Sequence, residues 1–86
     1  MAPNHPEMIE RLELSEAEDG LVVYDESIDR VHHLNTTAAV ILQLCDGTRD
    51  ANAIAEFLAQ GFGLDTPPLD ETIATLEKLT QEGLIR

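Results

Sequence analysis

The feature that most constrains the fold is a change in the spacing of apolar residues at Asn35. Before Asn35, β-branched and other apolar residues occur in short runs within residues 12–14, 21–24 and 30–34, which is typical of strands. After Asn35, apolar residues recur every three or four positions, as they do along one face of a helix. The sequence therefore predicts three strands followed by three helices, and its 86 residues are enough for one domain.

Turn-forming residues separate the three predicted strands. Residues 18–20 lie between the first two strands, and residues 25–29 lie between the second and the third. Short strands joined by tight turns predict an antiparallel meander, so we expect an α+β fold with a single domain over residues 9–86. Residues 1–8 contain two prolines and few apolar side chains, and we expect them to form a flexible tail.

Capping residues mark the ends of the predicted helices. At a helix start, a side-chain oxygen accepts a hydrogen bond from a backbone N–H that has no partner within the helix. Near the C-terminus, Gly83 favours the left-handed conformation that ends a helix, with Leu79 and Leu84 as the accompanying apolar pair. The predicted starts are Asn35, Thr36 or Thr37 for the first helix, Asp50 for the second, and Thr66 followed by Pro67 for the third.

The second and third helices each carry an apolar stripe. In the second helix, Ile54, Leu58 and Phe62 recur at four-residue spacing. Aromatic residues make up only 3% of the chain, so we expect aliphatic side chains and alanine to fill the core. The stripe of the third helix is formed by Leu69, Ile73, Leu76 and Leu79.

The charge balance restricts the partners of the protein. With 17 acidic and 5 basic residues, the formal net charge is −12. Binding to phosphate backbones needs clustered Lys and Arg, so nucleic acid and anionic membranes are poor candidate partners, whereas basic peptides or proteins are better ones. We expect a cytoplasmic protein, because the N-terminus lacks the apolar stretch of a signal peptide and no run approaches the roughly 18 apolar residues of a membrane span.

The residues needed for catalysis or metal binding do not occur in suitable patterns. There is no glycine-rich phosphate loop, no His/Cys set at metal spacing and no serine at a strand-to-helix turn, so we expect neither an enzyme nor a bound cofactor. His32 and His33 point to opposite faces of a strand, and a metal site would need His5 or distant carboxylates as well. Cys45 lies among apolar helix residues without a flanking cation, which favours a buried side chain over a reactive thiol.

The third predicted strand is a candidate binding element because a three-stranded meander has free edges. Residues 30–34 carry polar side chains rather than the Lys and Pro that usually protect an edge. A peptide could add to this edge as a further strand, with main-chain hydrogen bonds providing affinity. A helix could equally cover the edge, and the residues alone leave both alternatives open.

The central and C-terminal sequence resembles the PqqD-like family, also called the RiPP recognition element. The resemblance covers residues 20–86 and depends on five short features in order. They are Leu34-Asn35 at a strand end, Ala38-Ala39 in a helix, Cys45-Asp46-Gly47 and Thr48-Arg49 in a turn, an amphipathic helix with Ile54 and Leu58, and a closing Leu79, Gly83, Leu84 and Ile85.

This resemblance implies a winged-helix fold that binds the leader segment of a ribosomally made precursor peptide. In such domains the leader adds to the third strand and lies against the third helix, and a separate maturation enzyme, such as a radical SAM enzyme, a protease or a kinase, modifies the precursor. The flank of the helix that would face the peptide is left open. The implied peptide-binding residues are Arg30, Val31, His32, His33 and Leu34 on the strand and Leu69, Ile73, Leu76 and Glu77 on the helix.

Three alternatives involve other partners. A DNA-binding winged helix shares the expected architecture, but Lys78 is the one basic residue of the third helix. An acyl-carrier-like protein is also small and acidic, but it needs its serine at a helix start, and Ser27 lies in a predicted turn between strands. The edge strand could also pair with a second copy of the chain to form a homodimer.

Overall fold

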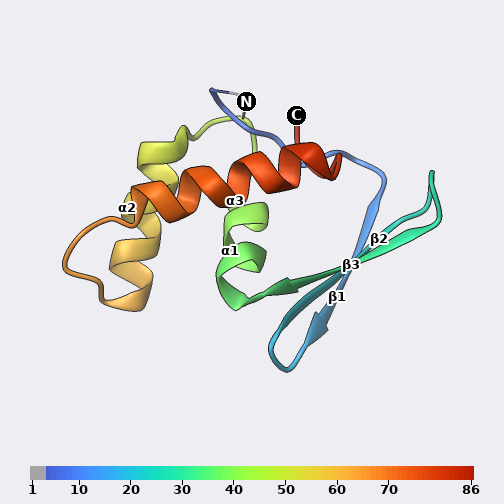
Figure 1. Ribbon diagram of the computed structural model, residues 1–86, viewed down its shortest axis with the longest axis horizontal. Helices are drawn as coiled ribbons and strands as arrows, with labels where there is room; N and C mark the ends of the chain where they lie inside the picture. Colours follow the sequence, from blue (N-terminus) through green and yellow to red (C-terminus); the bar gives the residue numbers. More distant parts are fainter. Residues whose placement is uncertain (1–3) are drawn as a thin grey trace.

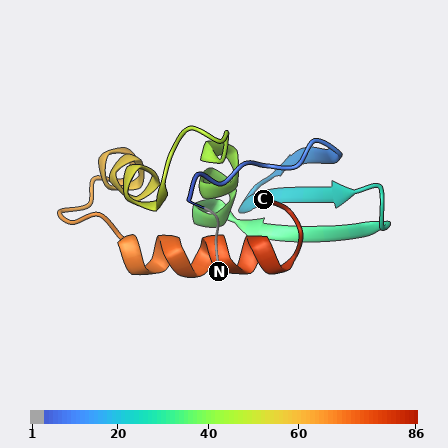
Figure 2. The ribbon, with the colours of Figure 1, turned by 90° about the horizontal axis from the view of Figure 1, so that it is seen from above.

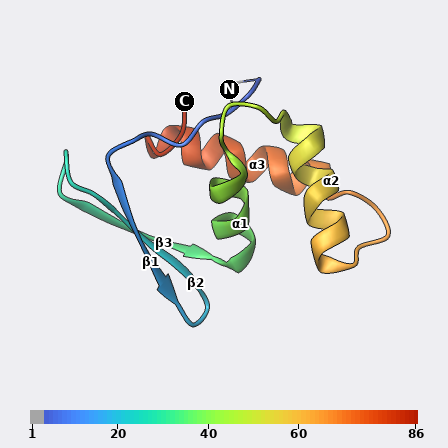
Figure 3. The ribbon, with the colours of Figure 1, turned by 180° about the vertical axis from the view of Figure 1, so that it is seen from behind.

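The computed structural model describes residues 4–86 and contains three strands followed by three helices. The elements are β1 (Leu12–Ala17), β2 (Gly20–Asp25), β3 (Arg30–Asn35), α1 (Thr36–Leu44), α2 (Ala51–Phe62) and α3 (Leu69–Gln81). Their order and the antiparallel pairing of the strands confirm the predicted α+β fold class. The sheet occupies one end of the molecule, α1 stands between the sheet and α2, and α3 spans the length of the helical part (Figure 1, Figure 3).

The sheet leaves the third strand with a free edge. β2 is the central strand, so β1 and β3 each pair on one side only. Val23 in β2 lies opposite Leu14 of β1 and His32 of β3. Seen from above in Figure 2, β3 is the strand that lies nearest to α3. The predicted third strand is therefore an edge strand on the side of the sheet that faces the last helix.

Aliphatic side chains from the sheet and from all three helices form one core, as the low aromatic content predicts. Leu21 and Val23 contribute from β2, and Leu42 and Leu58 contribute from the first two helices. Phe62, which the spacing predicts on the buried face of α2, is instead 46% exposed, so this prediction is wrong. Phe62 is the last residue of α2, where the apolar stripe extends past the layer on which the helix packs.

The N-caps of α1 and α2 are those predicted from the sequence. Asn35 Oδ1 accepts a hydrogen bond from the Ala38 N–H at 2.9 Å, and Asp50 Oδ1 accepts one from the Ala53 N–H at 2.9 Å. Asn35 is also the last residue of β3. Its cap therefore fixes the point at which the edge strand becomes a helix.

The start of α3 differs from the prediction. The helix begins at Leu69, and its N-cap is Pro68, with no side-chain hydrogen bond at the cap, so Thr66 does not cap it. A proline disfavours the helical conformation in the residue before it, and Pro68 thereby excludes Pro67 from the helix. The first turn is instead held by Thr72, whose hydroxyl donates to the Pro68 carbonyl at 2.8 Å.

The end of α3 confirms the predicted stop. Gly83 has a φ of 76°, which a residue with a side chain rarely adopts. The Leu84 N–H donates to the Leu79 carbonyl at 3.0 Å, and the Gly83 N–H donates to the Thr80 carbonyl at 3.0 Å. This pair of bonds defines a Schellman motif, which directs Leu84 back into the core.

The N-terminal segment differs from the flexible tail expected for residues 1–8, as far as the structure describes it. Pro6 is buried, the Met8 N–H donates to the Cys45 carbonyl at 2.8 Å, and Glu7 exchanges two backbone hydrogen bonds with Arg86, each 2.9 Å long. These bonds satisfy backbone groups that the C-terminal residues leave unpaired after α3 ends. Residues 1–3 of the expected tail lie outside the described part of the chain.

We expect Cys45 to be unreactive in the folded protein. Burial, with a smaller contribution from the charge of Asp46, raises the pKa of the Cys45 thiol to about 12, and thiolate is the reactive form. At about pH 8, iodoacetamide should therefore modify Cys45 slowly in buffer and readily in guanidinium chloride, as followed by intact mass. Equal labelling rates in the two conditions would show that the thiol is accessible in the native state.

Candidate functional site

A cavity of about 370 Å³ lies between the free edge of β3, the start of α1 and one flank of α3. Strand β3 and the first turn of α1 contribute Val31, His32, His33, Leu34, Asn35, Thr37 and Ala38. Helix α3 contributes Glu71, Thr75, Lys78 and Leu79, and Glu82 contributes from the position just after the helix ends. The lining is therefore a strand edge on one side and a largely polar helix flank on the other.

The two walls of this cavity are separated at the level of the backbone. No Cα atom of β3 lies within 8 Å of a Cα atom of α3 along the full length of the two elements. Neighbouring strands of a sheet lie about 4.8 Å apart, so α3 does not occupy the position of a further strand beside β3. The edge of β3 thus faces a cavity instead of a closely packed helix, which answers the question that the sequence left open.

The packing at Gly20 indicates which backbone groups of β3 face the cavity. A Cβ atom at Gly20 would lie 1.8 Å from the Leu34 oxygen, so this carbonyl is directed toward β2. In an antiparallel ladder, alternate residues of a strand direct their N–H and C=O groups to opposite sides. His32 and Leu34 therefore bond to β2, whereas Val31 and His33 direct their backbone groups toward the free edge.

His32 links the two walls through its side chain. Its Nδ1 atom lies 2.8 Å from Glu82 Oε2, and the two side chains are 8% and 29% exposed. Within residues 4–86, His32 Nε2 is the one buried side-chain nitrogen or oxygen without a hydrogen-bond partner. One ring nitrogen of His32 therefore contacts Glu82 across the cavity, and the other is buried without a partner.

The strand residues implied by the resemblance mostly line the cavity. Val31, His32, His33 and Leu34 all contribute to it, while Arg30 lies beyond its rim. The side chains alternate between the two faces of the sheet, so His32 is buried, whereas Val31 is 53% exposed. His32 and His33 therefore point to opposite faces, as predicted, and residues 4–86 contain no group of three metal-ligating side chains.

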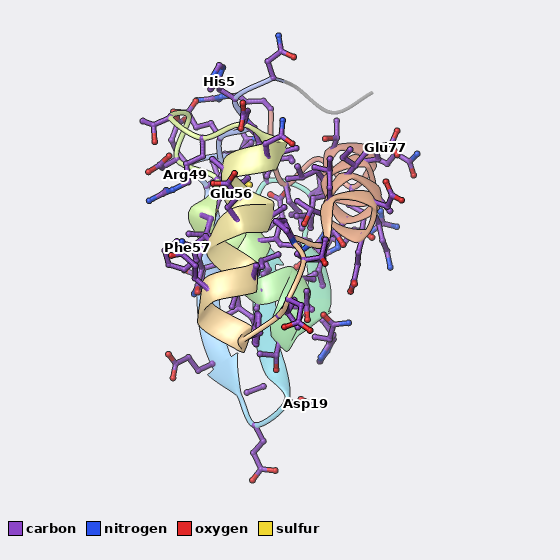
Figure 4. The ribbon with its side chains drawn as sticks, turned by 90° about the vertical axis from the view of Figure 1, so that its left-hand side faces the viewer. His5, Asp19, Arg49, Glu56, Phe57 and Glu77 are labelled. Atoms are coloured by element: carbon purple, nitrogen blue, oxygen red, sulfur yellow. The ribbon has the colours of Figure 1, made fainter. Side chains whose placement is uncertain are left out.

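The helix residues implied by the resemblance lie on another flank than the one that lines the cavity. Leu76 is 1% exposed and belongs to the core, and Glu77 lies on the side of α3 away from the sheet (Figure 4). Neither they nor Leu69 and Ile73 line the cavity. The sequence drew attention to the apolar stripe of α3, of which Leu76 and Leu79 belong to the core, whereas Ile73 is 39% exposed. The flank that lines the cavity is instead formed by Glu71, Thr75, Lys78 and Glu82.

This flank has a signal in the sequence that could have identified it. Its four residues recur at intervals of four, three and four positions, so they form a second stripe beside the apolar one. Choosing this polar flank over the opposite one requires knowing on which side of α3 the sheet lies. That information comes from the tertiary arrangement of the helices and is not contained in the helix itself.

We expect Glu82 to stabilise the fold through His32. Replacing Glu82 with alanine leaves the buried Nδ1–H without an acceptor, which should lower the free energy of unfolding by about 1–3 kcal/mol. His32→Leu removes both buried ring nitrogens and should be neutral or stabilising. Urea denaturation of the two variants, with Glu77→Ala as an exposed control on the same helix, measures the difference. An effect of Glu82→Ala no larger than that of Glu77→Ala would refute this role.

No described helix is long and apolar enough to span a membrane. A search of curated proteins found no match. Among solved structures, the chain is similar to one described as lasso peptide synthetase B1 complexed with the leader peptide, with a TM-score of 0.73 and 18% sequence identity. The alignment covers 95% of this chain and 98% of that one, and at this identity it shows a shared fold.

A family model gives the more specific result. Residues 20–85 match the model described as coenzyme PQQ synthesis protein D (PqqD). The matched region begins with β2 and includes β3, the three helices and both walls of the cavity. It also contains every motif on which the resemblance in the sequence was based. The chain is therefore a member of the PqqD family.

Proposed function

We propose that this protein is a non-catalytic domain that binds the leader segment of a ribosomally made precursor peptide. The leader would add as a fourth strand to the edge of β3 and lie in the cavity beside α3. The observation that carries the proposal is the free edge of β3, which pairs with β2 on one side and faces a cavity on the other. Membership of the PqqD family and the leader peptide bound in the structurally similar synthetase support it.

The backbone of β3 would provide most of the affinity. Val31 and His33 each offer an N–H and a C=O group toward the edge, so a peptide paired with them forms up to four hydrogen bonds. Alternate side chains of the peptide would point between β3 and α3, where they meet Leu34, Thr75 and Leu79. Micromolar binding, about −8 kcal/mol, is within reach of such a contact.

The opposite edge of the sheet is less suited to the same role. Strand β1 is almost entirely exposed and carries Glu13 and Glu16, and charged side chains on an edge strand oppose the addition of another strand. The cavity beside the end of β1, which lies between Glu16, Ala17 and α1, is smaller, at about 260 Å³. This asymmetry favours β3 as the edge that binds the peptide.

The bound precursor would be presented to a separate modifying enzyme in the cytoplasm, such as a radical SAM enzyme, a protease or a kinase. The domain itself would contribute no catalytic group. The same β3 edge could pair with a second copy of the chain, and such a homodimer would compete with the peptide because both use the same backbone groups.

The two other functions considered from the sequence are less compatible with the structure. A net charge of −12 opposes binding to DNA. Ser27, the candidate for an acyl-carrier arm, lies in the turn between β2 and β3 instead of at a helix start. Its hydroxyl donates to Asp25 Oδ1 at 2.7 Å, and this bond, with one from the Ser27 backbone, lowers the pKa of Asp25.

Titration with synthetic peptides tests the proposal. The peptides would cover the short open reading frames encoded beside the gene, and backbone amide NMR shifts would report the binding site. We expect the largest shifts at Val31, His33 and Asn35 and on the α3 flank at Thr75 and Lys78. Shifts confined to α2 or β1, or no binding by any of the peptides, would overturn the proposed site.

A further inference from the structure

Lys78 is a cation without an ion-pair partner on the wall of the cavity. Among the described basic residues, Arg49 pairs with Asp46 at 2.9 Å, and Arg86 pairs with Glu7 at 3.3 Å and with Glu10, whereas Arg11 and Arg30 have no carboxylate oxygen within 4.0 Å. Within the described residues, no carboxylate oxygen lies within 4.0 Å of the Lys78 ammonium. Of the three cations without such a partner, Lys78 is the one that lines the cavity.

Lys78 has no partner on its own helix because Glu82, the acidic residue best placed to pair with it, already contacts His32. Glu82 lies four residues after Lys78, a spacing at which side chains of a helix normally meet. Its carboxylate is instead held by His32 across the cavity, at 2.8 Å. Glu71, the next acid on this flank, lies seven residues earlier, about 10 Å along the helix axis. The neighbouring Glu77 is directed away from the sheet (Figure 4).

The cavity therefore has two differently charged parts on its helix wall. Lys78 provides a positive charge near the middle of the flank, and Glu71 provides a negative charge toward the start of α3. The strand wall opposite them consists of Val31, His32, His33, Leu34 and Asn35, none of which is acidic. Glu82, the other acid on this wall, is engaged by His32, so the Lys78 ammonium is the group on the helix wall that remains available to pair with an anionic ligand.

We propose that Lys78 makes this site specific for a peptide segment with an acidic residue at one inward-facing position. This inference builds on the proposed leader binding and adds the chemistry of the leader. The carboxylate of an Asp or Glu in the added strand would accept a charge-assisted hydrogen bond from the Lys78 ammonium. Glu71 would disfavour a second acid at the other end of the cavity.

Peptide display tests the proposal without a known leader. A library of random peptides displayed on phage would be selected separately on the wild-type protein, on Lys78→Glu and on Arg11→Glu. Arg11 is exposed and lies outside the cavity, so Arg11→Glu makes the same change in net charge at another place. Circular dichroism would show that the two exposed substitutions leave the fold intact.

We expect one acidic position among peptides selected on the wild type and on Arg11→Glu, and a basic residue at that position on Lys78→Glu. For a selected peptide, changing the acid to its amide should weaken binding to the wild type about tenfold and leave binding to Lys78→Glu unweakened. Peptides that shift the Val31 and His33 amides but show the same preference on all three proteins would overturn the inference and leave the proposed function intact. Failure to select any peptide that shifts these amides would overturn both.

Discussion

Replacing Gly20 with alanine is expected to lower the free energy of unfolding by about 3 kcal/mol or more and to disrupt the pairing of β2 with β3. Gly20 begins β2 with a φ of 154°, a conformation that residues with a side chain rarely adopt. An added Cβ would also lie 1.8 Å from the Leu34 oxygen, closer than two such atoms can approach. Strain and clash act together, and the total stability of a domain of this size is only about 4–13 kcal/mol.

Gly61→Ala is the matched control for this change. Gly61 lies within α2, has no neighbouring atom within 4 Å of an added Cβ, and is not among the glycines with positive φ. The same substitution should therefore raise stability by about 0.5–1 kcal/mol, because alanine is the better helix former. Thermal or urea denaturation of the two variants measures the contrast. Gly20→Ala with wild-type stability would show that Leu34 and Gly20 are not placed as described.

Val31→Pro is expected to weaken peptide binding about tenfold or more while leaving the sheet folded. Val31 directs its N–H toward the free edge, so proline removes a bond that only the peptide uses. Proline is tolerated on an edge strand when the missing N–H faces outward. The proline ring would also occupy part of the space beside β3. Isothermal titration calorimetry with a peptide that binds the wild type gives the change in affinity.

Glu16→Pro provides the same change on the other edge of the sheet. By the alternation that applies to β3, Glu16 in β1 directs its backbone groups away from β2. If binding occurs at β3, Glu16→Pro should leave the affinity unchanged. Equal losses for the two proline variants would mean that proline acts through the stability of the sheet. Unchanged binding by Val31→Pro would show that the peptide accepts no hydrogen bond from the Val31 N–H.

Local features of the fold could be predicted from the sequence because each depends on residues close together in the chain. Asn35 and Asp50 cap helices through backbone atoms three residues away. Gly83 ends α3 through bonds that stay within the last turn. The short run of β-branched and aromatic residues at 21–24 predicted β2 because such side chains pack well on the surface of a sheet.

Features that depend on distant parts of the chain could not be predicted in the same way. Glu7 pairs with Arg86 across almost the entire sequence, and nothing in the composition of residues 1–8 indicates this partner. The cavity-lining flank of α3 depends on the side from which the sheet approaches. The link between His32 and Glu82 joins a strand to a helix end. In each case the partner is chosen by packing and not by local spacing.

The central claim is that a peptide pairs with the backbone of β3, and amide hydrogen exchange at this strand tests it most directly. In the free protein, the His32 and Leu34 amides should exchange slowly because they bond to β2, whereas the Val31 and His33 amides should exchange rapidly. With a bound peptide, we predict that Val31 and His33 become slow as well. Rapid exchange at both residues while the peptide remains bound would contradict the account.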